Sequence, residues 1–479
     1  MLAPLRSESL EAFSDAARGA GRRAIRSLGN DAGVFEVGCL AIGVAMRLLW
    51  VLLVAPAPAH DAMWYVGKAS EMAQGLGYSE DGLPTAYWPV GYVAFLAALF
   101  VVTGPGLGIA RLANVVLSSV SLILVYRLTH RFTASPIAAR AALLMLSLYP
   151  ADIGFCSLAV SEPLFVTLTL LATEVLAARA GSRQAALAGV LFGLATLTRA
   201  HGLPLAIAVV SLLPGCTRRR LGMVLGACAL TMVPWVARNF VAFGELVPIS
   251  NNGGVALYIG NNPHATGRYG FGPKVRRALL EGRRWLGGPR EAEVNRRGVA
   301  LSIAHVSNHP WAVLKLWPHK LRYQFAGDSE FLWWSRSVEP SIRAWFPKLK
   351  PVFQAYYWTL CSVALCGLLI LVAGVEPRWI GRAFGAALVG ATAALQWYTL
   401  ALVLLATLFW RLRRPFEAPR ALWLPAAVVA YFVVTTLVFF GSERFHQPVV
   451  PWLVMCAGYG LGLVFKQPVE HSPSLHQEC

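Results

Sequence analysis

The chain has 479 residues, of which 56% are hydrophobic and only 14% are charged, and its mean hydropathy is +0.55. Soluble globular proteins contain about 45–50% apolar and about 25% charged residues, so this composition excludes an ordinary soluble enzyme as well as a disordered chain. The net charge of +18 does not favour nucleic-acid binding, because most cations lie in short segments between apolar runs, where they set membrane topology.

The first membrane span is predicted at 33–55. The polar segment 1–32 precedes it and carries four arginines near its end, which places that segment in the cytoplasm. The small residues at 55–59 resemble a signal-peptide cleavage site, but the leader would be far too long and Arg47 interrupts its apolar stretch. We therefore expect the first span to be retained and the first outer loop to cover 56–106.

Two helices are expected in this first outer loop. One is predicted at 62–74, directly after Asp61. The other is the apolar run 89–104, which is too short for a span and is more typical of a re-entrant or interfacial helix. The basic residues agree with this interpretation, because a full span here would place the arginine clusters that follow on the outer side.

Six further spans are expected before the chain becomes hydrophilic. They are 107–126, 137–156, 163–178, 185–199, 203–214 and 221–240. With this count every arginine cluster between them falls on the cytoplasmic side, as the positive-inside rule requires. The segment 33–240 is thus expected to form an N-terminal transmembrane catalytic module.

Residues 241–352 form the one large hydrophilic segment, and we expect it to lie outside the cell or in the periplasm. It is rich in tryptophan and in basic residues, a combination that is typical of a body resting on lipid head groups. The spacing of apolar residues over 291–325 predicts one long amphipathic helix.

The C-terminal membrane part is expected at 353–465, followed by the polar tail 466–479. Its clear spans are 353–374, 421–441 and 448–465. The stretch 383–410 is ambiguous: a single span would leave Arg411 to Arg420 outside, whereas two short spans place them inside, and we prefer two. The sequence therefore predicts an all-α polytopic membrane protein with about twelve spans, in a range of 11–13.

Three carboxylates are expected at the outer ends of these spans. Asp61 follows the first span, Glu162 opens the fourth, and Asp152 lies shortly before it. Asp is a common helix N-cap and Glu is favourable in a first helical turn, so helix-start chemistry is the alternative explanation for Asp61 and Glu162. A cap and a catalytic carboxylate do not exclude each other.

Cations and Asn-rich turns lie on the same side. Arg199, Arg238 and Arg444 are each placed at an outer end of a span, where an arginine is most often a snorkelling anchor. The turns around Asn251 and Asn261 are rich in Asn and Gly, which marks tight turns. Beside an arginine at a membrane surface, such turns could instead hold a phosphate or a sugar.

The order of these motifs resembles the polytopic glycosyltransferases that use lipid-phosphate sugars, the GT-C superfamily. It is most similar to the bacterial protein-mannosyltransferase-like branch, with the aminoarabinose and galacturonic acid transferases (glycosyltransferase family 39/83 type). The resemblance rests on Arg47, Asp61 with Tyr65, Gly75-Leu76-Gly77-Tyr78, Trp88-Pro89-Val90-Gly91-Tyr92, Ser161-Glu162-Pro163, Leu197-Thr198-Arg199, Pro234-Trp235 with Arg238-Asn239, the Asn-Gly turns, His309-Pro310 and Glu443-Arg444-Phe445-His446-Gln447-Pro448. Trp88 departs from members that carry Lys near the donor phosphate, and His446 stands at a variable position, so the donor sugar stays open.

The resemblance implies a GT-C fold, with juxtamembrane helices in the first outer loop and one large outer loop. It also implies transfer of a sugar from a polyprenyl phosphate to a hydroxyl of an envelope acceptor, with inversion. The chemistry favours Asp61 as the general base, because the acceptor proton must leave, and Glu162 as an orienting carboxylate. The cations expected to bind the donor phosphate are Arg199, Arg238 and Arg444, and the residues expected to line the cavity are His60, Tyr65, Trp88, Tyr92, Asn251 and Asn261.

The expected partners are the polyprenyl-phosphate sugar, a lipid, glycan or protein acceptor and membrane lipids, with no nucleic acid. We expect a monomer in the inner or plasma membrane, with the site on the periplasmic or extracellular side and with no required metal or other cofactor. The alternative is a transporter or flippase for a lipid-linked sugar. Transporters typically place charged or broken helices near mid-membrane in symmetric halves, whereas these carboxylates lie at one rim.

Overall fold

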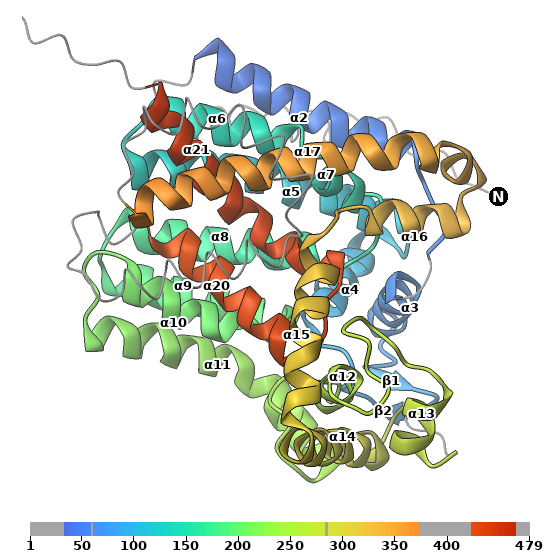
Figure 1. Ribbon diagram of the computed structural model, residues 1–479. Helices are drawn as coiled ribbons and strands as arrows, with labels where there is room; N and C mark the ends of the chain where they lie inside the picture. The colour runs from blue at the N-terminus through green and yellow to red at the C-terminus, as the bar shows by residue number, and fades with distance from the viewer. Residues whose placement is uncertain (1–32, 59–60, 283–285, 374–422, 466–479) are drawn as a thin grey trace, which may run out of the picture.

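The computed structural model describes residues 33–58, 61–282, 286–373 and 423–465. This part of the chain is almost entirely helical and contains one two-stranded antiparallel hairpin, in which β1 (Ser79–Glu80) pairs with β2 (Leu83–Pro84) (Figure 1). The expected N-terminal segment, the ambiguous stretch at 383–410 and the polar tail lie outside the described residues.

The N-terminal part follows the predicted spans closely, with one exception. The single span expected at 137–156 is two helices that meet just before Pro150, because proline has no backbone N–H to continue the first helix and is well suited to begin the second. The helices of this part are α2 (Val34–Leu53), α3 (Asp61–Ala73), α4 (Gly91–Thr103), α5 (Leu107–Thr133), α6 (Pro136–Ser147), α7 (Pro150–Phe155), α8 (Glu162–Ala178), α9 (Ser182–Thr198), α10 (Gly202–Leu212) and α11 (Arg218–Phe243).

Four of the described helical segments are long and apolar enough to cross a membrane, judged by length and composition. They are α2, α5, α11 and the continuous segment Glu443–Val464. Shorter apolar helices include α4, α6, α10 and α20 (Trp423–Val438). These helices support an all-α fold and a location in a membrane, whereas the count of about twelve spans stays a prediction.

Helix α4 is a short apolar helix that lies next to α3. Its 13 residues rise about 20 Å, less than the roughly 30 Å of a hydrocarbon core. The helix begins directly against the end of α9: a Cβ atom on Gly91 would lie 2.6 Å from the backbone nitrogen of Thr198. Glycine at this position therefore lets α4 approach the chain immediately before Arg199.

The large outer segment forms short helices and not the single long helix expected at 291–325. The chain breaks at His309, because Pro310 restricts the residue before it to non-helical conformations, and His309 has φ −134° and ψ 52°. The helices of this segment are α12 (Gly253–Gly260), α13 (Pro273–Leu280), α14 (Pro289–Asn308), α15 (Pro310–Phe325) and α16 (Glu330–Val338).

A buried carboxylate joins the large outer segment to the first outer loop. Glu291, which is 1% exposed, accepts hydrogen bonds from the Thr85 hydroxyl (2.6 Å), the Ala86 backbone N–H (2.8 Å), the Gly287 backbone N–H (3.0 Å) and the Asn251 side-chain amide (3.3 Å). These bonds come from two segments that are some 200 residues apart, so Glu291 fixes the two outer loops to each other.

The C-terminal helices run back through the bundle. Helix α17 (Pro340–Ala373) begins well before the span expected at 353–374. It is followed among the described residues by α20, the 3₁₀ helix η2 (Glu443–Val449) and α21 (Val450–Val464), which packs against α6 and α17 (Figure 1).

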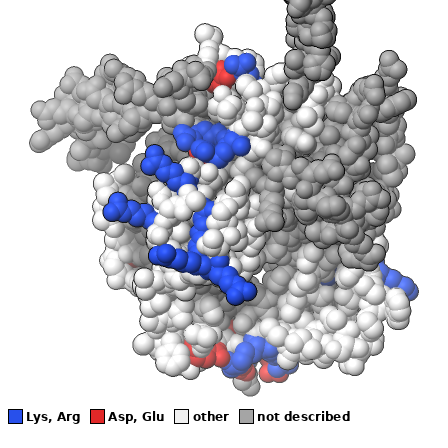
Figure 2. Space-filling model, turned by 90° about the vertical axis from the view of Figure 1, so that its left-hand side faces the viewer, with Lys and Arg blue, Asp and Glu red and all other residues white. Residues whose placement is uncertain are grey.

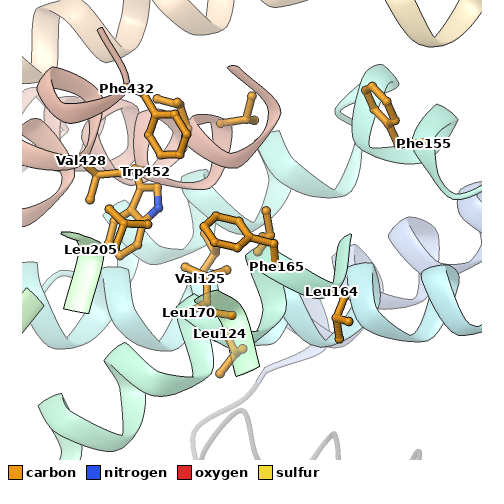
Figure 3. Close-up of a cluster of buried hydrophobic side chains, with 14 of the residues drawn as sticks. Leu124, Val125, Phe155, Leu164, Phe165, Leu170, Leu205, Val428, Phe432 and Trp452 are labelled. Atoms are coloured by element: carbon orange, nitrogen blue, oxygen red, sulfur yellow. The ribbon is translucent and has the colours of Figure 1, made fainter. Parts of the chain in front are cut away.

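The core between these helices is apolar and closely packed. Figure 3 shows side chains from α5, α8, α10, α20 and α21 directed toward one another, including Phe165, Leu205, Phe432 and Trp452. Each of these four is 2% exposed or less. Such packing holds the helix ends at fixed positions, which is what a preorganised site on those ends requires.

One end of the bundle is basic. The ends of α5 and α8 and the starts of α6, α9 and α11 meet there, and Figure 2 shows many Lys and Arg side chains on this face and few acidic ones. The arginines of these helix ends are Arg127, Arg131, Arg140, Arg179, Arg183, Arg218 and Arg219. This is the distribution that the positive-inside rule predicts for a cytoplasmic face.

Candidate functional site

Four of the residues singled out from the sequence meet at the end of the bundle opposite to the basic face. Asp61 begins α3 and Glu162 begins α8, while Arg199 follows the last residue of α9 and Arg444 lies in η2. Helices α8 and α9 form an antiparallel pair that starts or ends at this level, so Glu162 and Arg199 are brought together by their common helix boundary.

The four side chains form a chain of alternating charge. The Arg444 guanidinium binds Glu162 in a bidentate manner, through Nε to Oε1 and through Nη2 to Oε2 (3.2 Å). Its Nη1 donates to Asp61 Oδ2 at 2.6 Å. Arg199 Nη1 completes the chain with contacts to Glu162 Oε1 (2.8 Å) and to the Ser161 hydroxyl (3.1 Å). The cluster is formally neutral, as a buried set of charges should be.

Accessibility distinguishes the two carboxylates of this chain. The Glu162 side chain is fully buried, and the Arg444 and Arg199 side chains are 8% and 14% exposed. The Asp61 side chain is 32% exposed. A substrate can therefore reach Asp61, whereas Glu162 is enclosed by its two arginines.

Arg444 is held from its other side by helix α16, which the sequence interpretation did not include in the site. The Trp334 ring lies 4.8 Å from the guanidinium carbon, a cation–π contact. The Glu330 carboxylate accepts from the Arg444 backbone N–H (2.8 Å) and from the Ser442 hydroxyl (2.6 Å). The tryptophan-rich composition of this segment was a signal, but it did not distinguish Trp334 from the other tryptophans.

Tyr65 lies one helical turn after Asp61 and is buried against Tyr92, with their ring centroids 5.4 Å apart. Burial, together with the neighbouring Asp61 carboxylate, raises the pKa of the Tyr65 hydroxyl, so this group stays protonated. The Tyr92 hydroxyl donates to Asn114 Oδ1 at 3.3 Å. The structure thus places Tyr65 beside the charged chain and Tyr92 behind it.

Trp88 and Arg238 belong to a neighbouring aromatic cluster. The Trp88 ring lies 5.5 Å from that of Trp64, and the Arg238 guanidinium lies 5.0 Å from the Trp235 ring. Arg238 donates to the backbone carbonyl of Thr85 (2.8 Å) and to that of Tyr78. These bonds fix the first outer loop to α11, and they occupy the guanidinium that was expected to bind a phosphate.

The two asparagines expected in the cavity support the outer loops. The Asn251 backbone N–H donates to the Ala86 carbonyl (2.8 Å), and its side chain donates to Glu291 as described above. The Asn261 amide donates to the Val438 carbonyl (2.7 Å) and its oxygen accepts from Lys320 Nζ (3.1 Å). His60 lies outside the described residues.

Lys320 is a fully buried amine in the outer segment. Besides Asn261, it donates to the Leu437 carbonyl at 2.9 Å, and both of these partners are neutral. Burial without a carboxylate partner lowers the pKa of Lys320 from 10.5 to about 8.

Asp152 forms a separate ion pair with the buried Arg47. Its carboxylate accepts from Arg47 and from the Ser118 hydroxyl, and Arg47, which is fully buried, also donates to the Leu146 and Ser147 carbonyls. Asp152 is therefore occupied in joining α2, α5 and α7. It contacts none of the four residues of the charged chain.

Within the described residues, no group of three or more His, Cys, Asp or Glu side chains could hold a metal ion together. Reaction without a metal therefore stays a prediction. The acid–base chemistry open to the site is that of one reachable carboxylate, two guanidinium groups and a protonated tyrosine.

Comparison with known proteins gives a distant structural likeness. No family model matches the chain, and no curated protein matches it. It is similar to ArnT from Cupriavidus metallidurans in crystal structures bound to undecaprenyl phosphate and in the apo state, with 17% and 16% identity and a TM-score of 0.36 for each. The match covers 89% of this chain and 77% or 76% of the ArnT chain. This TM-score is too low to assign roles to residues, so the chemistry must be argued from the site itself.

Proposed function

We propose that the protein is an integral membrane glycosyltransferase that moves a sugar from a polyprenyl phosphate to a hydroxyl of a cell-envelope acceptor. The observation that carries this proposal is the position of Asp61 at the accessible end of an otherwise buried chain of charges. A carboxylate in this position can receive a proton from a substrate while its orientation is fixed by the protein.

Asp61 fits the role of general base. Only its Oδ2 atom is bound by Arg444, and Oδ1 has no hydrogen-bond partner among the residues that the structure describes. In an inverting transfer the acceptor hydroxyl attacks the anomeric carbon from the side opposite to the phosphate, and its proton passes to a base as the new bond forms. Such assistance contributes about 10²–10⁴-fold to the rate.

Arg199 is the arginine best placed to bind the donor phosphate. The leaving phosphate is already a stable anion, so it needs cations and oriented N–H donors more than protonation. Arg199 uses Nη1 for Glu162 and Ser161, while its Nε and Nη2 make no hydrogen bond to the described part of the chain. Arg444 is committed to two carboxylates, so we assign it first to the orientation of Asp61 and only second to the phosphate.

Glu162 then acts through the two arginines. It is buried, it lies between both guanidinium groups, and it neutralises one of their two charges. This orients Arg199 and Arg444 before any substrate arrives, which is how preorganised electrostatic catalysis avoids reorganisation during the reaction.

The test compares purified wild type with Asp61→Asn and with Glu71→Gln. Glu71 lies on the same helix α3, is partly exposed and pairs with Lys68, so its variant controls for a lost carboxylate on this helix. Each protein is incubated in detergent with bacterial polyprenyl-phosphate sugars and a cell-envelope extract, and transfer is followed by mass spectrometry. We expect Asp61→Asn to be slower by about 10²–10⁴-fold at an equal melting temperature, and Glu71→Gln to match wild type.

Equal transfer by wild type and Asp61→Asn would remove Asp61 from catalysis. The flippase alternative would instead be favoured if wild type moved a lipid-linked sugar between the leaflets of a liposome membrane and transferred sugar from none of the donors tested.

A further inference from the structure

A second cluster of buried polar groups lies directly behind Arg444. His446 is fully buried, with Nδ1 2.5 Å from the Gln324 carbonyl oxygen and Nε2 3.2 Å from Asp328 Oδ1. Asp328 is 3% exposed, and its other oxygen accepts from the Tyr149 hydroxyl at the start of α7. The proposed reaction uses none of these groups.

The geometry indicates that His446 is held as a cation. Both ring nitrogens face oxygen atoms that can only accept: a backbone carbonyl at Nδ1 and a carboxylate at Nε2. A neutral imidazole would direct a lone pair at one of these acceptors, whereas the doubly protonated ring donates to the Gln324 carbonyl through Nδ1 and places its charge beside the Asp328 carboxylate at Nε2. Asp328 and His446 thus form a buried ion pair, next to the chain of charges that contains Asp61.

Two aromatic rings stack against the imidazole. The Tyr357 ring of α17 lies 4.8 Å away with an interplanar angle of 16°, and the Phe325 ring of α15 lies 6.4 Å away at 18°. Both rings are nearly parallel to the imidazole and pack against it, which leaves His446 little freedom to turn. The ring is therefore held by the hydrogen bond at Nδ1, by the ion-pair contact at Nε2 and by two stacked neighbours.

The ion pair is one part of a set of contacts between two short segments. Three consecutive residues of the large outer loop each bind the turn that carries Arg444: Asp328 binds His446, Ser329 binds Glu443, and Glu330 binds Ser442 and the Arg444 backbone N–H. Glu443 Oε2 accepts from the Ser329 backbone N–H at 2.6 Å and from its hydroxyl at 3.2 Å. All contacts of this set connect 328–330 with 442–446.

We propose that Asp328 and His446 are a positioning pair, which fixes the turn 442–446 against the large outer loop so that the Arg444 guanidinium stays between Asp61 and Glu162. As a statement about catalysis this rests on the proposed function; as a statement about where Arg444 is held it does not. Arg444 has bonds to both carboxylates but lies on a short 3₁₀ turn, so its position depends on what holds that turn. The outer loop is therefore part of the site's support and not only its cover.

The test uses His446→Phe, Asp328→Asn and the double variant. Phe keeps an aromatic ring next to Tyr357 and Phe325 but removes both ring N–H groups, and His446→Gln keeps an amide donor if His446→Phe does not fold. The control is Glu36→Gln, which breaks the ion pair between the buried Glu36 carboxylate and Arg140 at the basic end of the bundle. Two properties are measured: amide hydrogen exchange of the peptide 440–449, and kcat and KM for transfer.

We expect hydrogen exchange at 442–446 to become at least about tenfold faster in both single variants and to remain unchanged in Glu36→Gln. We expect kcat to fall by about tenfold or more, with KM for the donor nearly constant. The reason is that a misplaced orienting group reduces stabilisation of the transition state and does not reduce substrate binding. The double variant should be no worse than either single variant, since both remove the same interaction.

Two results would overturn the proposal. One is unchanged exchange at 442–446 in both single variants; the other is a loss of kcat no larger than that of Glu36→Gln at an equal folded fraction. If wild type shows no transfer, the proposed function fails, and the exchange measurement alone still decides whether the pair holds Arg444 in place.

Discussion

The two ends of the helix bundle use the same chemistry in opposite senses. At the basic end, Glu36 and Glu174 are the buried partners, with side chains 0% and 7% exposed. Their arginines are the accessible ones: Arg140 pairs with Glu36 and is 44% exposed, and Arg127 and Arg131 pair with Glu174 at 35% and 36%. The carboxylates there hold arginines that face outward.

At the other end the arrangement is reversed. Arg444 is the buried partner and Asp61 is the accessible one, with Glu162 and Arg199 enclosed behind them. Exposed guanidinium groups suit lipid head groups and fix topology, whereas an exposed carboxylate held by a buried arginine suits proton transfer. The comparison teaches that the accessible partner of an ion pair at a helix end is the informative one. An accessible arginine fits a topology role, and an accessible carboxylate fits a chemical role.

The largest expected effect on stability comes from removing the buried cation. Arg444→Met leaves Asp61 without an arginine and Glu162 with only one, and the loss of one partner from a buried pair costs about 3–5 kcal/mol. Thermal unfolding in detergent, followed by circular dichroism, measures this effect. A loss of stability below about 1 kcal/mol would show that these four charged side chains behave like an exposed ion pair. The contrast between the two ends of the bundle would then disappear.

A buried amine gives the next largest effect, and it depends on pH. The pKa of Lys320 is lowered to about 8 in the folded protein, so between about pH 8 and 10.5 the unfolded state binds the additional proton. Stability therefore rises with pH in this window, by about 1.4 kcal/mol per pH unit relative to Lys320→Met, and the penalty is complete below pH 8. Melting curves of both proteins from pH 7 to 10 test this; a constant difference would contradict it.

The Trp334 ring, which contacts the buried Arg444 guanidinium, should contribute more to stability than a ring that contacts an exposed cation. Trp334→Leu removes a cation–π contact to a buried guanidinium and should reduce stability by about 2 kcal/mol, with a fall in transfer rate. Trp345→Leu is the matched control, because Trp345 is 55% exposed and contacts Lys348, and it should cost less than about 1 kcal/mol. Equal losses of stability in the two variants would indicate that burial of Arg444 does not strengthen its cation–π contact.

The smallest effect is expected at the basic end. Arg131→Gln leaves Arg127 on Glu174, and the pair that it removes is partly exposed, so the loss should stay below about 1 kcal/mol. Transfer activity should not change. Reduced transfer at an equal melting temperature would show that the two ends are coupled through the bundle.

The sequence was sufficient for those parts of the site that depend on local pattern. A span followed by Asp61 and a helix, and an antiparallel pair of helices with Glu162 and Arg199 at the same level, follow from hydropathy and from the arginine clusters. These signals work because a membrane imposes one length and one polarity on each helix.

The features that the sequence did not predict depend on contacts between distant segments or on backbone carbonyls that need a hydrogen-bond donor. Arg444 reaches Asp61 across 383 positions, and no local spacing encodes that pairing. Arg238 was expected at a phosphate, but the carbonyls of the first outer loop bind it, and hydropathy does not show which carbonyls lack a partner. The break at His309 was visible as a Pro310 motif, yet the apolar spacing on both sides concealed it.

The separation of Asp61 and Arg444 along the chain has a consequence for biosynthesis. Arg444 comes directly before α21, the last helix that the structure describes. A ribosome must translate past it, and the insertion machinery must have accepted nearly every earlier span, before the guanidinium can reach Glu162. Until that moment the nascent protein lacks the arginine that binds Asp61 and Glu162. A truncated product that stops before Arg444 would therefore contain Asp61 and Glu162 without the arginine that joins them, and we expect it to be inserted into the membrane but inactive in the proposed transfer.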